Sequence, residues 1–137
     1  MEAKPILIVD DEKNICLTLS QALEVLGAET DTALNGEEAL VKLDKKEFGL
    51  ILLDLRMPGM DGMEVLRRVR EIRPDIRVII LTAYGTIESA VEAMKLGAVD
   101  FIQKPFSPDE IRGLVSRVMD REKLDEQKAV SYTHLTL

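Results

Sequence analysis

The sequence predicts a doubly wound α/β domain, in which a five-stranded parallel sheet carries helices on both faces. Short, continuously apolar runs recur along the chain, as is typical of strands that are buried on both sides of a parallel sheet. Between these runs lie segments whose apolar residues repeat with helical spacing. Because crossovers between parallel strands are right-handed almost without exception, helices are expected on both faces of the sheet.

Five apolar runs are expected to form the strands. The clearest runs occupy residues 6–9, 49–53, 78–81 and 98–102, and the run at 28–32 is weaker. They alternate with helical segments, so the predicted order is strand then helix, repeated five times. The first and last helices are expected to share one face of the sheet.

Five amphipathic segments are expected to form the helices. Their apolar positions are Ile15, Leu19, Ala22, Leu23 and Leu26; Ala39, Leu40 and Leu43; Val65, Leu66, Val69 and Ile72; Ile87, Ala90, Val91 and Met94; and Ile111, Leu114, Val115, Val118 and Met119. Asn35 and Asp61 each lie three residues before a glutamate, which predicts two N-terminal caps. Pro108, after a serine, predicts the start of the last helix. Gly27 and Gly97 predict two helix ends.

Length and composition argue against a nucleic-acid-binding, disulfide-bonded or membrane-spanning domain. The chain has 137 residues, a formal net charge of −7, one cysteine and one histidine, His134. The acidic balance argues against direct contact between this domain and nucleic acid. One cysteine excludes an internal disulfide and fits a reducing compartment, and no apolar run reaches the roughly 18 residues of a membrane span. We therefore expect a cytoplasmic domain that uses neither a histidine triad nor a multi-histidine metal site.

The chain is expected to hold one domain followed by two short segments. The domain occupies residues 1–121, and the charged residues 122–128 are expected to continue the last helix as the start of a linker. Residues 129–137 (AVSYTHLTL) have no helical period and resemble adapter read-through, so we expect a non-native or disordered tail.

Polar side chains follow four of the predicted strands, at the sheet edge where parallel α/β domains bind ligands. Asp10 and Asp11 follow the first strand, Asp54 the third, Thr82 the fourth and Lys104 the fifth. Each has a plainer explanation by itself. The first two aspartates can cap a helix, Asp54 can stand in a turn, the threonine can bond to nearby backbone, and the lysine can be solvated. Their convergence on one edge favours a shared site.

The chemistry of this set favours magnesium and phosphoryl transfer. Two carboxylates about 4 Å apart repel by about 4 kcal/mol at an effective dielectric near 20, so three of them need more positive charge than Lys104 supplies. An oxygen-only set without histidine or thiol suits Mg²⁺. Magnesium and a lysine neutralise the charge on a transferred phosphoryl group, and a carboxylate in line with it can act as the nucleophile.

Four segments resemble the receiver domain of two-component response regulators. They are Ile8-Val9-Asp10-Asp11-Glu12, Leu53-Asp54-Leu55-Arg56-Met57-Pro58-Gly59-Met60-Asp61-Gly62, Leu81-Thr82-Ala83 and Phe101-Ile102-Gln103-Lys104-Pro105-Phe106. They occur in the family's order and span residues 4–121. The resemblance implies strand order 2-1-3-4-5 and cytoplasmic phosphotransfer from a sensor histidine kinase. It also implies a signalling domain whose only reactions are its own phosphorylation and dephosphorylation, not an enzyme.

The resemblance also implies a role for each residue of the set. Asp54 is the expected phosphoacceptor, and Lys104 is expected to pair with the phosphoryl group. Asp11 and Asp54 are the expected direct Mg²⁺ ligands, with the backbone carbonyl of Arg56 as a third and Asp10 acting mainly through water.

Three further residues are expected to serve the switch or its geometry. Thr82 is expected to swing towards the phosphoryl group together with Phe101, and the Lys104–Pro105 bond is expected to be cis. The movement would change the face formed by the fourth helix, the fifth strand and the fifth helix. This would control homodimerisation or an output domain. Most apolar residues there, such as Ile87 and Val91, are expected to be core.

The segments at 82–85 and 104–106 are similar to receivers of NtrC-type, sigma-54-dependent activators. The similarity implies ATPase and DNA-binding output domains outside these 137 residues. Two alternatives stay open. One is a degenerate receiver that works as an interaction module without phosphorylation, although no residue of the set is missing. The other is an aspartate-nucleophile phosphatase, against which the adjacency of Asp10 and Asp11 counts.

Overall fold

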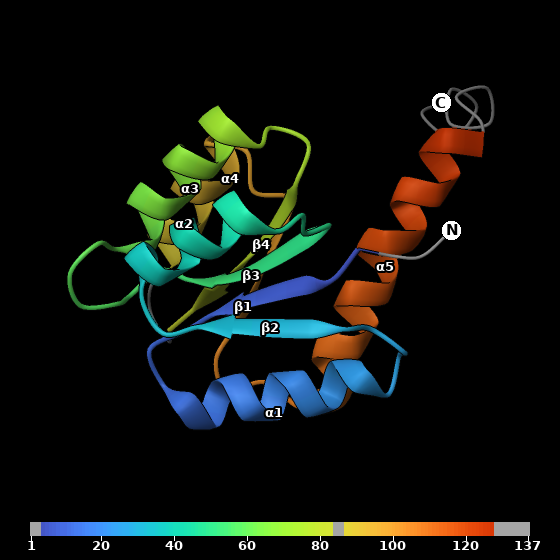
Figure 1. Cartoon of the computed structure of the whole chain (residues 1–137). Coiled ribbons are helices and arrows are strands. Elements are labelled where there is room, and N and C mark those ends of the chain that lie inside the picture. Colours follow the sequence, from blue (N-terminus) through green and yellow to red (C-terminus); the bar gives the residue numbers. More distant parts are fainter. Residues whose placement is uncertain (1–3, 84–86, 128–137) are drawn as a thin grey trace.

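The computed structural model describes residues 4–83 and 87–127, and strands alternate with helices throughout this part of the chain (Figure 1). The predicted tail at 129–137 lies outside the described residues. The elements are β1 (Ile6–Val9), α1 (Lys13–Glu24), β2 (Thr30–Ala33), α2 (Gly36–Lys45), β3 (Leu50–Asp54), α3 (Gly62–Ile72), β4 (Arg77–Thr82), α4 (Ile87–Lys95), β5 (Asp100–Gln103) and α5 (Pro108–Gln127). Helix α5 thus includes residues 122–127, the start of the predicted linker.

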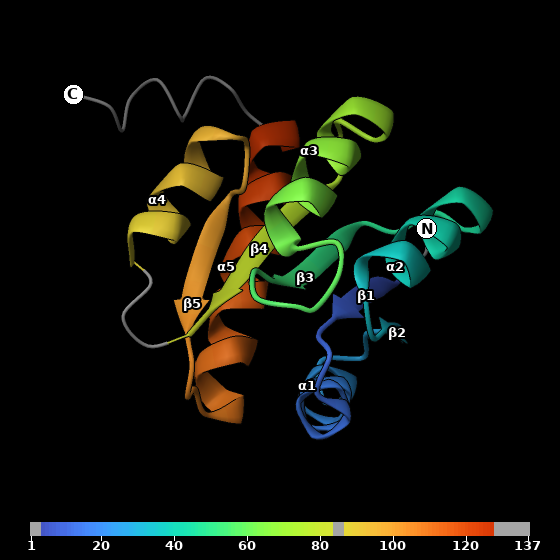
Figure 2. The same cartoon turned by 90° about the vertical axis from the view of Figure 1, so that its left-hand side faces the viewer.

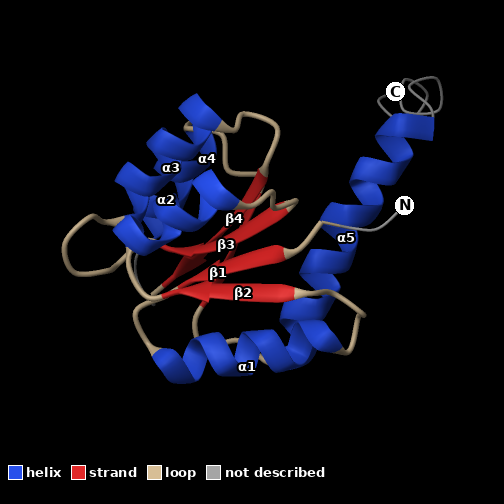
Figure 3. Ribbon diagram, viewed as in Figure 1, coloured by secondary structure: helices blue, strands red, loops and turns tan. Residues whose placement is uncertain are grey.

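The strands form one parallel sheet in the order β2-β1-β3-β4-β5. Figure 3 shows the first four of these strands side by side. In the centre, Ile8 of β1 lies beside Thr32 of β2 on one side and beside Leu52 of β3 on the other. The predicted fold class and the strand order that the resemblance implied are both confirmed. The reversal of strand order between β1 and β3 opens a crevice site at the carboxyl ends of these two strands.

Two hydrophobic cores fill the space between the sheet and its helices. Because successive side chains of a strand point to opposite faces, Leu7 and Val9 of β1 join the core under α2, α3 and α4. Ile6 and Ile8 join the core under α1 and α5. Helices α1 and α5 therefore share a face, as the sequence predicts (Figure 2).

Strands β2 and β5 begin two residues later than predicted, because the residues before them complete the preceding helices. After α1, Gly27 has φ +81° and Ala28 N–H donates to Leu23 O at 3.3 Å. After α4, Gly97 has φ +115° and Ala98 N–H donates to the backbone of that helix in the same way. Glycine at the left-handed position followed by such a bond is a common helix end, so both glycines stop their helices as predicted.

The predicted N-terminal caps are present. Asn35 and Asp61 accept hydrogen bonds from the backbone of Glu38 and Glu64, at 2.8 and 3.0 Å. Ser107 caps α5 in the same way. Together these caps fix where three of the helices begin.

Several predicted core positions are exposed. Ile72, Ile87 and Val91 are 54%, 45% and 46% exposed, and Leu26 and Met94 are also open to solvent. The expectation that Ile87 and Val91 belong to the core is therefore wrong. Helix α4 turns two small residues inward, Ala90 and Ala93, which leaves its larger apolar side chains outside. Across the described residues, no helix combines the length and the apolar character that spanning a membrane demands.

Candidate functional site

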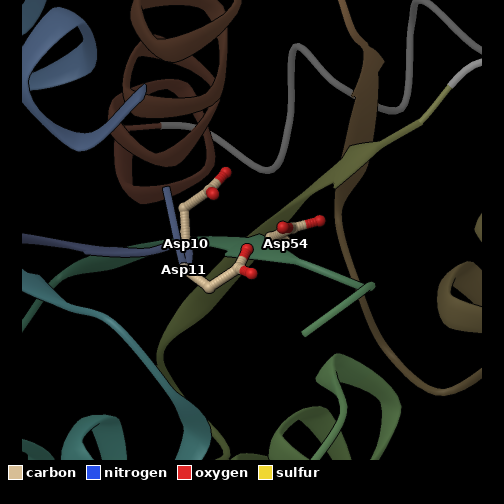
Figure 4. A group of neighbouring side chains, drawn as sticks. All are labelled: Asp10, Asp11 and Asp54. Atoms are coloured by element: carbon tan, nitrogen blue, oxygen red, sulfur yellow. The ribbon is translucent and has the colours of Figure 1, made fainter. Parts of the chain in front are cut away.

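The carboxyl ends of three neighbouring strands bring the predicted polar residues together. Asp54 is the last residue of β3, Thr82 is the last residue of β4, and Asp10 directly follows β1. All three are buried, with exposed fractions of 3% or less. Figure 4 shows the carboxylates of Asp10, Asp11 and Asp54 gathered beside the ends of β1 and β3. Strand polarity and order thus place groups that are 44 residues apart in one pocket.

The three carboxylates form a compact oxygen cluster. One oxygen from each of Asp10, Asp11 and Asp54 lies within 4.8 Å of the others, and Asp11 is exposed whereas the other two are buried. Two of the carboxylates also accept backbone hydrogen bonds. Asp10 Oδ1 accepts from Glu12 N–H at 2.9 Å, and Asp54 Oδ1 accepts from Arg56 N–H at 3.1 Å. These bonds orient the side chains and leave the Oδ2 atom of each beside Lys104 Nζ.

Helix capping does not explain the first two aspartates. The residue that precedes α1 as its N-cap is Glu12, and its side chain makes no capping hydrogen bond. The bond that Asp10 accepts comes from Glu12 itself, before the first turn of the helix. The cluster is therefore not a by-product of the start of α1.

Lys104 lies inside the cluster instead of in solvent. Its Nζ is 2.9 Å from Asp10 Oδ2 and 3.5 Å from Asp54 Oδ2, and its side chain is 19% exposed. Burial alone would lower the pKa of Lys104, but the close contact with Asp10 and the negative charges of Asp10, Asp54 and Glu12 outweigh burial and raise it. The lysine is therefore held as a cation against the two buried carboxylates.

One ammonium group does not compensate three carboxylates. Burial and the charge of Asp10 raise the pKa of Asp54 from 3.8 to about 6, although the Arg56 N–H and Lys104 oppose the shift. A raised carboxyl pKa means that the ionised form is disfavoured in the folded protein. The cluster as it stands carries more negative charge than its surroundings stabilise.

The residues present fit a magnesium ion. The donors are all oxygens, the type that Mg²⁺ prefers. Asp10 Oδ2 is buried, and although it lies in the ion pair with Lys104 it lacks the alignment of a hydrogen bond. Asp10, Asp11 and Asp54 would hold the ion, with the backbone of Arg56 close by, and the ion would supply the missing positive charge. The acidic triad is of the kind typical of magnesium sites.

The residues predicted to form the switch lie on β4 and β5. Thr82 Oγ1 donates to Ile102 O at 3.5 Å, so its hydroxyl bonds to the neighbouring strand β5 in this structure. Phe101 is half-buried and packs against the core beneath α2, α3 and α4. The Lys104–Pro105 peptide bond is cis. The side chain of Arg56 is exposed, and the contact of this residue with Asp54 is through the backbone.

Sequence reasoning missed two residues of the site. Glu12 Oε1 lies 3.8 Å from Lys104 Nζ, and nothing in its local pattern points there. Gly62, at the start of α3, lies against the end of β3, where a Cβ would be 2.4 Å from Asp54 O and 2.6 Å from Leu55 Cα. Glycine is thus required by the close approach of α3 to the backbone that carries Asp54.

Cys16 packs behind the cluster as a buried thiol. Its Sγ donates to Asp10 O at 3.3 Å, and burial together with the charge of Asp10 raises the pKa of the thiol to about 11. A thiol of this kind is a poor nucleophile.

Comparisons with known proteins point to one family. A sequence model of the response regulator receiver domain matches residues 6–116. The chain is 43% identical over 119 residues to sporulation initiation phosphotransferase F of Bacillus subtilis, which covers 87% of this chain and 96% of that protein. It is 37% identical over 127 residues to the DNA-binding transcriptional regulator NtrC of Salmonella typhimurium, which covers 93% of this chain and 27% of the regulator.

Solved structures agree with the sequence matches. NtrX from Brucella abortus superposes with a TM-score of 0.87 and 34% identity, over 92% of this chain and 29% of NtrX. The BeF₃-activated DrrB receiver domain superposes with a TM-score of 0.78 and 34% identity, over 87% of this chain and 99% of that domain. The chain thus spans nearly all of some relatives and less than a third of others.

Proposed function

Because this chain belongs to the response regulator receiver domain family, we propose that it accepts a phosphoryl group from a sensor histidine kinase onto Asp54. The observation that carries the proposal is the position of Asp54. Its carboxylate is buried at the carboxyl edge of the sheet, 3.5 Å from the Nζ of Lys104, which also pairs with Asp10. A carboxylate acceptor, a fixed cation and an acidic metal site are the groups that phosphoryl transfer needs.

In the proposed reaction, a carboxylate oxygen of Asp54 forms a bond to phosphorus while the phosphorus–nitrogen bond of the donor phosphohistidine breaks. The imidazole leaves with the electron pair of that bond and is protonated. Mg²⁺ bound at the triad would supply positive charge against the phosphoryl oxygens. Lys104, already 3.5 Å from Asp54 Oδ2, is placed to pair with the same oxygens. The Arg56 N–H holds the carboxylate in one orientation.

We propose that Thr82 transmits the phosphorylated state. Its hydroxyl would exchange Ile102 O for a phosphoryl oxygen, because a charged acceptor makes the stronger hydrogen bond. Phe101, packed at the core boundary of β5, would then turn inward and change the α4–β5–α5 face. The exposure of Ile87 and Val91 on α4 supports an interface there, for a homodimer or an attached domain.

The relatives suggest two outputs for the phosphoryl signal. The similarity to NtrC favours control of ATPase and DNA-binding domains in a cytoplasmic transcription regulator, of which this domain would be the part that does not touch nucleic acid. The similarity to a sporulation phosphotransferase along 96% of its length favours a second candidate, in which the domain passes its phosphoryl group to another protein. Both outputs share the same acceptor chemistry.

Intact mass after incubation with acetyl phosphate and Mg²⁺ tests the acceptor. We expect the wild-type protein to gain one phosphoryl group, and we expect no gain for Asp54→Asn or in the presence of EDTA. Asp61→Asn is the matched control, because Asp61 lies on the same loop but caps α3. Loss of the gain in this control, or persistence of the gain in Asp54→Asn, would place the acceptor elsewhere. No gain with acetyl phosphate or with any kinase would favour the interaction module.

A further inference from the structure

A second charged cluster covers the free edge of the sheet at β2, at the opposite edge from β5 and the α4–β5–α5 face. Strand β2 has a neighbour only on its β1 side (Figure 3). The free edge of a strand presents unpaired backbone groups, which invite pairing with another chain. Three side chains around this edge, Asp31, Glu38 and Lys42, are here called the edge clamp.

The hydrogen bonds to β1 show which backbone groups of β2 face outward. Ile6 N–H donates to Glu29 O at one end, and Asp10 N–H donates to Ala33 O at the other. In a parallel pair the groups that face the neighbour alternate along the strand. The odd-numbered residues of β2 therefore bond to β1, and the N–H and C=O of Thr32 point to the free edge.

The edge clamp satisfies these outward groups with its side chains. Thr32 N–H donates to Asp31 Oδ1 at 2.8 Å, and Lys42 Nζ donates to Thr32 O at 2.5 Å. One step further along, Leu34 N–H donates to Glu38 Oε1 at 2.8 Å. The outward N–H and C=O of Thr32 and the N–H of Leu34, which a new strand would need, are thus occupied by side chains of the chain itself.

Ion pairs lock the clamp together. Lys42 Nζ is 2.9 Å from Asp31 Oδ1 and 3.7 Å from Glu38 Oε2. Lys46, the residue that directly follows α2, adds a pair with Asp31 at 3.8 Å. Partial burial alone would raise the pKa of Asp31, but the hydrogen bonds from Lys42 and Thr32 and the charges of the two lysines hold it below its ordinary value. The cluster is thus compensated, in contrast to the one at Asp54.

We propose that the edge clamp closes β2 to strand addition, and that opening it lets β2 of a second copy of this chain pair at this edge. Two copies related by a two-fold axis would bring identical strands side by side in antiparallel orientation. Leu17 on α1 and Val41 on α2 are 57% and 51% exposed. They line surface hollows on either side of β2, so a second copy would also bury apolar surface.

The clamp has a consequence for assembly. Strands β2 and β5 lie at opposite edges of the sheet (Figure 2). With the β2 edge closed, the α4–β5–α5 side, where exposed apolar residues of α4 are found, stays available for association between copies. The clamp thereby selects which edge of the domain assembles.

Sedimentation equilibrium of the unphosphorylated chain tests the proposal. Lys42→Met removes the ammonium that joins Asp31, Glu38 and Thr32 O while keeping an unbranched side chain of similar length. We expect it to self-associate about tenfold or more tightly than the wild type, which is 1.4 kcal/mol or more. Lys45→Met is the matched control, since Lys45 lines the same hollow on α2 but makes none of the clamp contacts; it is expected to behave as wild type.

A second variant identifies the surface. Thr32→Pro removes an outward N–H that β1 does not use, so a proline is tolerated at this edge position but strand addition is blocked. Added to Lys42→Met, it is expected to restore wild-type association, with circular dichroism confirming that each variant is folded. Equal association of Lys42→Met and Lys45→Met, or association that Thr32→Pro does not reverse, would overturn the proposal.

Discussion

Replacement of Asp54 by asparagine is expected to stabilise the metal-free domain, although it removes the proposed acceptor. The pKa of Asp54 is raised from 3.8 to about 6, because the carboxyl group is buried and lies near the charge of Asp10. A difference of about 2 pKa units corresponds to about 3 kcal/mol. Asparagine has the same shape, keeps an oxygen for the Arg56 N–H and carries no charge. We therefore expect the free energy of unfolding to rise by about 1 to 3 kcal/mol near pH 7.

The sign of the effect follows from proton linkage. A carboxyl group with a raised pKa binds its proton more tightly in the folded state than in the unfolded state. The destabilisation from Asp54 is therefore absent below its unfolded pKa of about 3.8, grows as the pH rises, and is complete above about 6. The advantage of Asp54→Asn over wild type should shrink to less than about 1 kcal/mol near pH 4.

Urea unfolding followed by circular dichroism in EDTA measures this difference at both pH values. Asp11→Asn is the matched control, because Asp11 belongs to the same cluster but is exposed, and its substitution is expected to change stability less. Added Mg²⁺ should stabilise the wild type more than Asp54→Asn, because binding to the folded state alone adds to its stability. A destabilised Asp54→Asn protein near pH 7, or a difference that does not depend on pH, would refute the electrostatic reasoning.

Three further outcomes are expected. Gly62→Ala should lower the free energy of unfolding by more than about 2 kcal/mol and slow phosphorylation, because its Cβ meets the backbone at the end of β3. Gly113→Ala in α5, where the Cβ has open space, should raise the free energy of unfolding by about 0.5 to 1 kcal/mol. Urea unfolding and phosphorylation kinetics check both variants. Asp61→Ala should lower the free energy of unfolding by about 1 kcal/mol, because it removes the cap of α3. An unchanged free energy of unfolding in urea would contradict that role. Cys16 should react with iodoacetamide about tenfold or more slowly in the native protein than in urea, and equal rates would show that the thiol is accessible.

The sequence is informative about the fold where hydrophobic pattern alone decides the structure. The continuous apolar runs at β1, β3 and β4 identify buried strands, and the polar residue at the end of each run locates the site. The pattern fails for α4, because two alanines pack inward while larger side chains stay outside. An apolar stripe specifies a helix face, but it does not specify which half of a broad stripe meets the sheet.

The sequence predicts the charged residues of the candidate site better than it predicts the tertiary contacts that hold them in place. The residues that bear charge at strand ends are visible from their position, and the structure gathers them. Gly62 is not visible, because the need for glycine arises from the approach of α3 to the end of β3, a tertiary contact between separate elements. The ion pair of Glu12 with Lys104 likewise depends on where β5 ends relative to β1.

The pKa values of Asp31 and Asp54 shift in opposite directions, which distinguishes the charged cluster at β2 from the one at the candidate site. At β2, Lys42 on α2 and Lys46 just after it hold the pKa of Asp31 below its ordinary value, so the charges stabilise the fold as they stand. At the carboxyl edge, the pKa of Asp54 is raised although Lys104 is near, so the charged form of this carboxylate is disfavoured in the fold. Groups with perturbed pKa values gather at functional sites because function needs a charge that the fold alone does not favour. A phosphoryl group on Asp54 would add further negative charge, so the excess at this edge couples the proposed phosphorylation to a bound cation, whereas the closed β2 edge needs no ligand.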